Sequence, residues 1–339
     1  MKWISVAPMM DRTDRHFRFL IRTLSRRAWL YTEMITAPAL IHGDAKRLLR
    51  FHPTEHPIAL QLGGSDPKEL ARCAEIAREE GYDEINLNVG CPSERVQSGS
   101  FGVCLMGEPE RVAECMQAMS DVSGLPVSVK HRIGFDNHDS YEELTRFVNL
   151  IAKTGCKRFI VHARKAWLKG LSPKENREKP PLRYDVVEQL KKDFPELDIS
   201  VNGGIKTWEE TEQHLHVFDG VMIGRQAYDN PFMFARLDSR FYGETDPMQT
   251  REEVAQALIP YVKTELERGE RFSSVVRHFT GLYAGVRGAK AWRQTLCCDA
   301  GREGGGIEIL EKAIEDVAKA SHVGIENSEY LVSPDFTTP

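Results

Sequence analysis

The sequence predicts a (β/α)8 barrel of the TIM type, an α/β fold, followed by a C-terminal all-helical domain. Short β-rich runs alternate with longer amphipathic runs, and this unit occurs eight times before residue 230. Such alternation produces right-handed crossovers and a parallel sheet. The Gly-x-Gly-x-x-Gly sequence typical of the open, doubly wound alternative is absent. After about residue 240, helical patterns follow one another without strands.

The strands are expected where β-branched and apolar residues form short runs between turn-forming residues. In chain order these runs are Trp3–Ala7, Leu30–Thr32, Ile58–Leu62, Glu84–Val89, Pro126–His131, Arg158–His162, Asp198–Asn202 and Gly220–Ile223. The amphipathic helices expected between them are Pro67–Glu80, Glu108–Met119, Tyr141–Lys153, Tyr184–Lys192 and Thr207–His214. Eight such units close into a barrel of about 250 residues.

The helical patterns of the C-terminal part are Arg251–Arg268, Phe272–Arg287 and Ile307–Ala320. We therefore expect a barrel domain over residues 1–240 and a helical domain over residues 241–330. A chain of 339 residues has the length for a barrel with such an appendage.

The composition is that of an ordinary globular protein, with 41% hydrophobic and 28% charged residues. No apolar run approaches the roughly 18 residues that a membrane helix needs. The first residues lead directly into a strand and lack the three-part layout of a signal peptide. We expect a cytoplasmic protein with no membrane segment.

The seven cysteines, at positions 73, 91, 104, 115, 156, 297 and 298, are scattered. None of their spacings, alone or with histidine, is typical of metal ligands. We therefore expect no metal site and a reducing compartment. We also expect the protein to be a monomer.

The formal net charge of −5 disfavours nonspecific binding of nucleic acid. Two stretches nevertheless concentrate positive charge. Residues 164–183 hold seven Lys or Arg against two Glu, and residues 271–302 hold six against one Asp. Each stretch is either a solvated face or a surface that contacts a phosphate backbone, and both interpretations stay open.

The most informative motif is Asn86-Leu-Asn-Val-Gly-Cys-Pro-Ser93. Gly90 and Pro92 interrupt the strand pattern on either side of Cys91, and Pro92 disfavours helix at the preceding residue. The thiol therefore follows directly after a strand, at the end of a barrel where catalytic residues gather. The alternative is a small buried packing residue, the commonest role of a lone cysteine.

Nearly every other expected strand also ends in hydrogen-bonding residues. These are Pro8–Met10, Glu33, Gln61, Asn88, Lys130–Arg132, His162, Asn202–Gly204 and Gly224–Arg225. Singly, each has a structural explanation: Gln61 as a polar loop residue, His162 as a core histidine, Lys130 as a surface cation with a buried stem. Together they indicate a binding site that surrounds the barrel mouth.

The Cys91 motif and the Gly-rich loop that follows it, to Met106, resemble the active-site signature of the tRNA-dihydrouridine synthases. The order of motifs along the chain is similar too: Ala7–Met10, Gln61–Gly64, Val129–Arg132, Val161–Arg164, Val201–Gly204 and Met222–Arg225. The stretches His162–Arg177 and His278–Arg293 resemble the bacterial A subfamily, whose members modify uridine 20, and often 20a, of the tRNA D-loop.

This resemblance implies an FMN enzyme, with NADPH as reductant and tRNA as substrate. In the family reaction, hydride passes from FMN N5 to C6 of uracil, and Cys91 would protonate C5. The implied FMN contacts are Pro8, Met9, Met10, Gln61, Lys130, His162, Asn202, Gly203, Gly204, Gly224 and Arg225. The implied substrate contacts are Asn88, Lys174, Arg177, Lys290 and Arg293.

Two alternatives stay open. A different flavin barrel, acting on a free pyrimidine such as dihydroorotate, would use the cysteine as a base and would not need the C-terminal basic helices. A tRNA-binding or folding factor without catalytic activity would bind tRNA but would show no flavin absorbance.

Overall fold

The computed structural model describes residues 2–94, 96, 99–299 and 305–329, and the chain forms two compact units. The first unit comprises the residues up to Arg18 and Arg27–Gln226. The second comprises Phe19–Arg26 and the chain from Ala227 onward. The predicted division into domains of residues 1–240 and 241–330 stays a prediction, and residue 330 lies outside the described residues.

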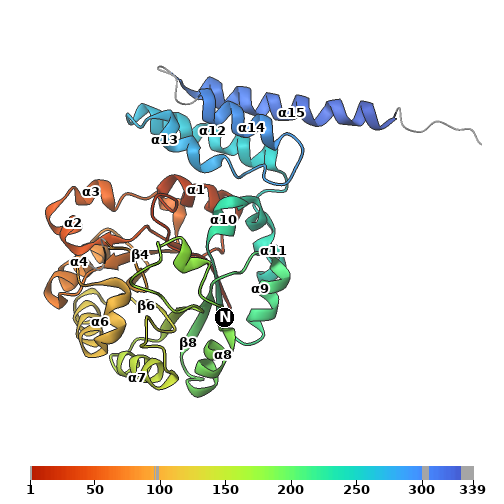
Figure 1. The fold of residues 1–339 in the computed structure, drawn as a ribbon. Coiled ribbons are helices and arrows are strands. Elements are labelled where there is room, and N and C mark those ends of the chain that lie inside the picture. Colours follow the sequence, from red (N-terminus) through yellow and green to blue (C-terminus); the bar gives the residue numbers. More distant parts are fainter. Residues whose placement is uncertain (1, 95, 97–98, 300–304, 330–339) are drawn as a thin grey trace, which may run out of the picture. The chain divides into compact units, whose positions relative to one another are not determined.

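The first unit is an eight-stranded parallel barrel with one additional short strand, as far as the described residues extend (Figure 1). Its strands are β1 (Trp3–Val6), β2 (Leu30–Tyr31), β3 (Ile35–Thr36), β4 (Ile58–Gly63), β5 (Glu84–Val89), β6 (Val127–Arg132), β7 (Arg158–His162), β8 (Asp198–Asn202) and β9 (Gly220–Ile223). They are hydrogen-bonded in the order β1-β9-β8-β7-β6-β5-β4-β2. The barrel closes beside β2, where Trp29 N donates to Ile4 O at 2.9 Å and Val6 N to Trp29 O at 3.0 Å.

The predicted fold class is therefore confirmed, and all eight predicted strands are present within one or two residues of their expected bounds. The ninth strand, β3, was not predicted. It contains two residues and pairs with the end of β4 at Leu62 and Gly63, so it is too short to produce an alternating pattern.

Alternate residues of each strand face the barrel interior. An apolar cluster fills part of this interior and consists of Ala7, Tyr31, Ala59, Ile160 and Met222. Glu84 is the register partner of Ala59, and Asn86 that of Gln61, so the polar residues of β5 face inward as well. The apolar residues between them, Ile85 and Leu87, are fully buried. The polar side of β5 therefore faces the inside of the barrel and not solvent.

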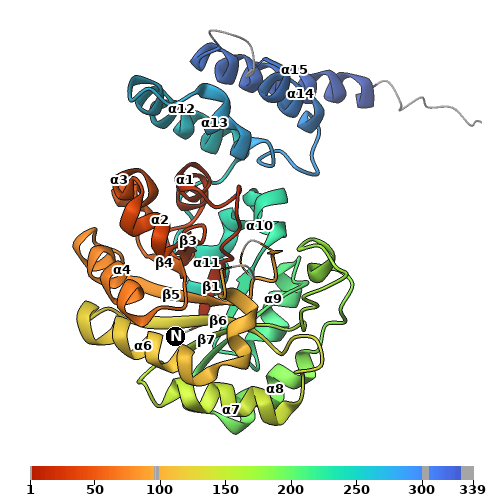
Figure 2. The ribbon, with the colours of Figure 1, turned by 60° about the vertical axis from the view of Figure 1, so that its left-hand side comes forward.

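Helices surround the barrel strands (Figures 1 and 2). The helices up to the end of the barrel are α1 (Arg15–Leu24), α2 (Ala37–His42), α3 (Ala45–Leu48), α4 (Pro67–Glu79), α6 (Pro109–Ser123), α7 (Tyr141–Ala152), α8 (Tyr184–Asp193), α9 (Trp208–Leu215) and α10 (Arg225–Asp229). Ser140 and Thr207 cap α7 and α9, each in a reciprocal pair with a glutamate three residues later. Such caps satisfy backbone N–H groups at the helix start.

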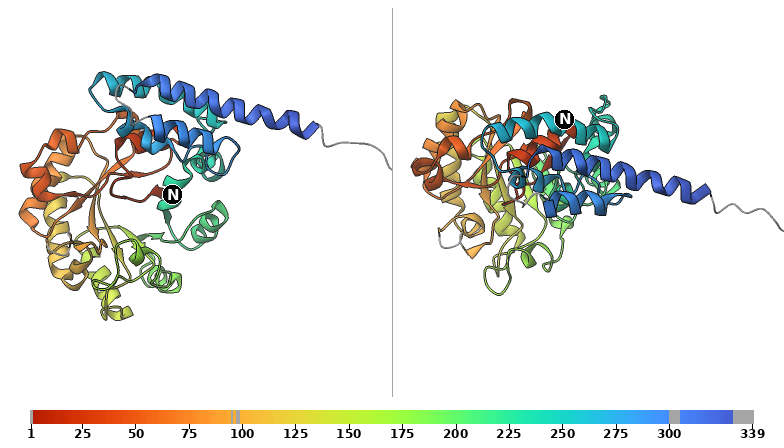
Figure 3. Two further views of the ribbon diagram at one scale, coloured as in Figure 1. Left: turned by 45° about the horizontal axis from the view of Figure 1, so that its top comes forward. Right: turned by 90° about the horizontal axis from the view of Figure 1, so that it is seen from above.

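The rest of the second unit contains helices and turns but no strand among its described residues; the helices are α11 (Leu237–Tyr242), α12 (Arg251–Glu267), α13 (Phe272–Val276), α14 (Ala289–Gln294) and α15 (Ile307–Glu329). Helix α15 is the longest of these and packs against α12 and α14 (Figure 3). Trp292 is fully buried in this unit, and its Nε1 donates to Phe279 O at 2.8 Å.

The prediction of one helix over Phe272–Arg287 was wrong. Helix α13 ends at Val276, and a short 3-10 turn and further turns follow it. Gly285 and Gly288 have φ values of 75° and 87°, a conformation that ends a right-handed helix. Arg287 consequently lies before α14, which carries Lys290 and Arg293.

All seven cysteines are free thiols. Among the described residues, no group of three or more His, Cys, Asp or Glu side chains is placed to hold a metal ion. No helix in the described part of the chain combines the length and the apolarity needed to cross a membrane.

Candidate functional site

Five predicted site residues lie at the carboxyl ends of five consecutive strands of the barrel. Gln61 lies in β4, Asn88 in β5, Lys130 in β6, His162 in β7 and Asn202 in β8. Asn88 is the register partner of Lys130, and His162 is that of Asn202, so these side chains lie at one edge of the sheet. The structure thus brings the central part of the predicted site together.

Lys130 lies half-buried in this group without a charged partner. Its Nζ donates to Asn202 Oδ1 at 3.1 Å, and Asn202 Nδ2 donates in turn to Met222 O at 2.8 Å. Among the described residues, no carboxylate lies within ion-pair distance of Lys130. Burial and the Arg132 guanidinium lower the pKa of Lys130 to about 7. An anionic ligand at this position would stabilise the ammonium form.

The Cys91 turn is the second component of the site. Asn88 Oδ1 accepts from Gly90 N at 3.1 Å and from Cys91 N at 3.0 Å. Cys91 O accepts from Val103 N at 3.1 Å, so the turn is also joined to the far end of its loop. The thiol itself is half-buried and has one weak contact, to Ser93 Oγ at 3.5 Å. Hydrogen bonds to the backbone therefore hold the turn while Sγ has no strong partner.

Arg132 supports the same turn, a role that the sequence analysis did not assign to it. Its Nε donates to Gly90 O at 2.9 Å, and Nη1 donates to Lys165 O and Asn176 O, both at 3.1 Å. The side chain is buried, and burial lowers its pKa to about 10. Arg132 thus connects the Cys91 turn to the loop of residues 164–183. Its place in the Val129–Arg132 motif is the one sequence signal that pointed to it.

The loop of residues 164–183 carries the predicted substrate contacts Lys174 and Arg177. Asn176 lies between them and is buried; its Oδ1 accepts from Trp167 N at 2.7 Å and its Nδ2 donates to Trp167 O at 2.9 Å. Lys174 and Arg177 are exposed on either side of it. One buried amide therefore orders the loop and leaves both cations at the surface.

The predicted phosphate site follows β8 and β9. Gly203 and Gly204 have φ values of 116° and 78°. A Cβ at Gly203 would lie 2.6 Å from the His162 ring, and one at Gly204 would lie 2.6 Å from the Leu182 side chain. At Gly224 a Cβ would meet nothing closer than Ala7 Cβ at 3.8 Å. The backbone at 203–204 therefore favours glycine, whereas a Cβ at Gly224 would make only an ordinary contact.

Positive charge is concentrated around His162. Burial, followed by Arg132, Lys130, Arg164 and Arg177, lowers the pKa of His162 well below its usual value, so this histidine is neutral. Arg225 pairs with Glu178, and its Nη2 donates to Arg177 O at 3.4 Å. This arrangement suits an anionic ligand or an RNA backbone.

The segment Pro8–Met10 forms a tight turn after β1. Met9 N donates to Thr13 Oγ1 at 2.9 Å, and Met9 O accepts from Thr13 N at 3.0 Å. Met9 packs against the apolar cluster of the barrel interior, while Met10 is 54% exposed. The turn thus presents an apolar side chain next to the polar strand ends.

Lys290 and Arg293 belong to the second unit. Both are exposed on α14, on either side of the buried Trp292. Neither forms an ion pair with any carboxylate among the described residues. They lie in a different compact unit from the other predicted site residues.

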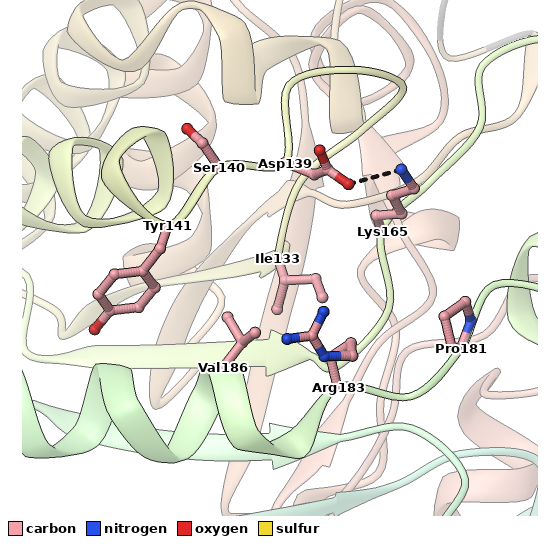
Figure 4. Close-up of a pocket in the computed structure, with 8 residues that line it drawn as sticks. All are labelled: Ile133, Asp139, Ser140, Tyr141, Lys165, Pro181, Arg183 and Val186. Atoms are coloured by element: carbon pink, nitrogen blue, oxygen red, sulfur yellow. Dashed lines mark hydrogen bonds and ion pairs between the residues drawn. The ribbon is translucent and has the colours of Figure 1, made fainter.

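A pocket of about 330 Å³ lies beside the start of α7 and α8, and none of the predicted site residues lines it (Figure 4). Its two cations already have partners: Lys165 Nζ lies 2.6 Å from Asp139 Oδ2, and Arg183 Nη2 lies 2.7 Å from Asp185 Oδ2. Because its charges are neutralised within the chain, we place the functional site at the strand ends and not in this pocket.

Comparison with known proteins gives concordant matches. The family model described as "Dihydrouridine synthase (Dus)" matches residues 5–318. The chain is 55% identical over 312 residues to a protein of Synechocystis sp. named tRNA-dihydrouridine(20/20a) synthase, covering 92% of this chain and 93% of that protein. It is 55% identical over 313 residues to a protein of the same name from Shewanella oneidensis, with coverages of 92% and 93%.

Solved structures with a similar fold include the old yellow enzyme homologue from Zymomonas mobilis, with a TM-score of 0.50 and 11% sequence identity. The match covers 71% of this chain and 88% of that chain. At this identity the likeness is one of fold, and it agrees with the parallel barrel described above.

Proposed function

This chain belongs to the dihydrouridine synthase family, and on that premise we propose that it reduces uridine to 5,6-dihydrouridine in tRNA. We assign the reaction to position 20 of the D-loop, and to 20a, because the relatives carry these positions in their names. FMN is the proposed bound cofactor and NADPH the proposed reductant. The observation that carries the proposal is the alignment of Gln61, Asn88, Lys130, His162 and Asn202 at five strand ends, directly beside Cys91.

Two features of the chain test whether these residues fit FMN. Lys130 has a neutral acceptor and no carboxylate partner among the described residues, so it can receive the electron-rich edge of the flavin ring. Residues 203–204 have positive φ values and close side-chain neighbours, which favour glycine as in an anion-binding turn. The residues therefore fit the cofactor. Gln61, Lys130 and His162 would hold the ring, Pro8–Met10 would lie against it, and Asn202–Gly204, Gly224 and Arg225 would hold the phosphate.

When bound, the flavin would supply hydride chemistry, with NADPH as the hydride source and C6 of the uracil ring as the acceptor. The remaining steps belong to the chain. Cys91 donates a proton to C5, because a thiol placed beside the reacting carbon can act as a general acid. Asn88 holds the backbone of the Cys91 turn, and Lys174 and Arg177 contact the RNA around the base.

The target base must leave the folded tRNA to reach the strand ends, at a cost of a few kcal/mol. The cations of residues 164–183 and of α14 would hold phosphates while it does so. Exposed cations can fix the position of an RNA through its phosphates without contacting its bases. Such contacts suit an RNA substrate that is recognised by its shape.

One experiment on the purified chain separates this function from the alternatives. The protein is incubated with NADPH and unmodified tRNA, and the tRNA nucleosides are then analysed by mass spectrometry. A flavin absorption spectrum and new dihydrouridine at positions 20 and 20a are expected. Activity on free dihydroorotate or uracil, without tRNA product, would indicate the other flavin barrel. A colourless protein that binds tRNA but cannot be reconstituted with FMN would indicate a factor without catalytic activity.

A further inference from the structure

The strands β4, β5 and β6 are neighbours in the barrel (Figure 2). A continuous chain of hydrogen-bonded side chains joins them in the barrel interior. It consists of Asn88 Nδ2 to Gln61 Oε1 at 2.9 Å, Gln61 Nε2 to Asn86 Oδ1 at 2.7 Å, Asn86 Nδ2 to Ser128 Oγ at 2.7 Å, and Ser128 Oγ to Glu84 Oε1 at 2.5 Å. Glu84 and Asn88 lie near opposite ends of β5. This polar chain therefore links the two ends of the barrel.

The chemistry at both ends determines the direction of this polar chain. At the Cys91 end, the N–H groups of Gly90 and Cys91 can only donate, so they require the oxygen of the Asn88 amide. At the other end, an ionised Glu84 can only accept, so it requires the hydroxyl hydrogen of Ser128. The amides of Gln61 and Asn86 lie between these ends, and each has one orientation that satisfies both neighbours.

Glu84 is a buried carboxylate that pairs with a guanidinium. Burial raises the pKa of Glu84 above its usual value, and the guanidinium of Arg158, together with the hydroxyl groups of Ser128 and Tyr31, opposes part of that rise. Arg158 also lies 3.0 Å from Asp198 and stacks on Trp3, with its guanidinium carbon 3.8 Å from the ring centre. Tyr31 OH donates to the same carboxylate oxygen as Ser128, at 3.1 Å.

The contribution of the Glu84 carboxylate is seen when the hydrogen bonds of the polar chain are imagined with the opposite direction. If both central amides turned over, Gln61 Nε2 would face Asn88 and compete for the oxygen that holds the Cys91 turn. Ser128 would then donate to Asn86, and Glu84 would lose a donor. Tyr31 would then be the remaining hydroxyl donor to this buried oxygen, and the loss of the shorter hydrogen bond from Ser128 is unfavourable, so the carboxylate disfavours the reversed chain. A glutamine at position 84 could donate to Ser128 and would permit it.

We propose that Glu84 is a positioning residue, which holds the Cys91 turn in place by fixing the direction of the polar chain through Ser128, Asn86 and Gln61. The assignment of a reactive role to Cys91 rests on the proposed function. The link between Glu84 and the turn does not, because it concerns the geometry of the turn alone. Six residues of strand at about 3.3 Å each place Glu84 too far from Cys91 to act by direct contact.

The test measures alkylation of Cys91 by iodoacetamide in the flavin-free protein without tRNA, by mass spectrometry of tryptic peptides. Cys104 lies in a separate peptide and serves as an internal control. We expect iodoacetamide to alkylate Cys91 about fivefold to tenfold faster in Glu84→Gln and in Ser128→Ala than in the wild-type protein. This factor corresponds to the loss of about one net hydrogen bond to the turn. Ser128→Thr keeps the hydroxyl and should restore the original rate. Ser200→Ala, a matched change at a buried serine of β8, should leave it unchanged.

Wild-type rates at Cys91 in both Ser128→Ala and Glu84→Gln would overturn the proposal. Equal acceleration by Ser200→Ala would do so as well, because it would indicate general loosening of the barrel. Ser128→Ala leaves the pair between Glu84 and Arg158 in place, so the test does not depend on Glu84→Gln folding. Failure of the wild-type protein to form dihydrouridine would contradict the proposed function while leaving the alkylation result unaffected.

Discussion

The ammonium group of Lys130 lies 3.1 Å from Oδ1 of Asn202, two strands away across the barrel mouth. This contact joins the residue that would face the flavin ring to the residue that begins the phosphate turn. A neutral amide oxygen cannot neutralise the lysine, so the pair retains a preference for an anion. Several expected outcomes depend on this and on the other contacts of the site.

The first prediction concerns pH. The pKa of Lys130 is about 7 in the folded chain against a usual 10.5, so between these values the unfolded chain binds a proton that the folded chain lacks. Stability then rises with pH across this window, because the unfolded state binds more protons. We expect urea unfolding of flavin-free protein to show a smaller rise with pH in Lys130→Met than in the wild type. Parallel pH profiles would contradict the lowered pKa.

The second prediction concerns the proton donor. Cys91→Ala should keep FMN and still oxidise NADPH, while dihydrouridine formation falls by about 10² to 10⁴, the usual contribution of a positioned acid. Single-turnover reduction of tRNA by pre-reduced enzyme measures this. Cys104→Ala changes a half-buried thiol in the same loop and should have a much smaller effect. Equal losses in the two variants would show that packing of the loop matters and not the Cys91 thiol.

The third prediction concerns the cofactor phosphate. Arg225→Ala should weaken FMN binding by about tenfold or more, since a charge-assisted contact to an anion contributes about 1.5–3 kcal/mol. Fluorescence titration of the flavin-free protein gives the dissociation constant. Arg183→Ala is the control, because Arg183 is exposed and pairs with Asp185. An unchanged affinity in Arg225→Ala would remove this residue from the phosphate site.

The fourth prediction concerns the second unit. The double variant Lys290→Ala and Arg293→Ala should bind tRNA more weakly and lower the salt slope of binding by about 2, since fewer counterions are released. FMN content and NADPH oxidation without tRNA should not change. The measurement is tRNA affinity across a salt series.

Two exposed lysines before β7, Lys153 and Lys157, provide the matched control for that double variant. They lie at the amino end of the strand, opposite the predicted site, so their removal should leave the salt slope unchanged. Superimposable curves for Lys290→Ala with Arg293→Ala and the wild type would exclude α14 from the tRNA site.

The sequence predicted the barrel well because its strands are short, regular and separated by clear helical runs. Glu84–Val89, Arg158–His162 and Asp198–Asn202 have the predicted bounds. The predicted helix Phe272–Arg287 failed because the apolar pattern continues past Val276, where α13 ends, into a 3-10 turn and further turns. Sequence periodicity reports which residues are apolar, and it does not report backbone conformation.

The strand ends were equally predictable, but the contacts among them were not. Alternation along β5 usually indicates that polar residues face solvent, whereas Glu84 and Asn86 face the barrel interior and bind partners on other strands. Arg132 was also missed as a support of the Cys91 turn. It binds main-chain carbonyl groups, and such contacts leave no pattern of side chains in a sequence.

Because Arg132 binds main-chain carbonyl groups, it restricts how the enzyme could be re-engineered. Arg132 joins the Cys91 turn to the loop of residues 164–183 through the carbonyl oxygens of Gly90, Lys165 and Asn176. Substitution of loop side chains therefore does not remove the hydrogen bonds of Arg132, provided that the backbone keeps its path at residues 165 and 176. Variants with altered RNA contacts should be sought by substitution within the loop, because insertions or deletions there would displace the thiol together with the loop.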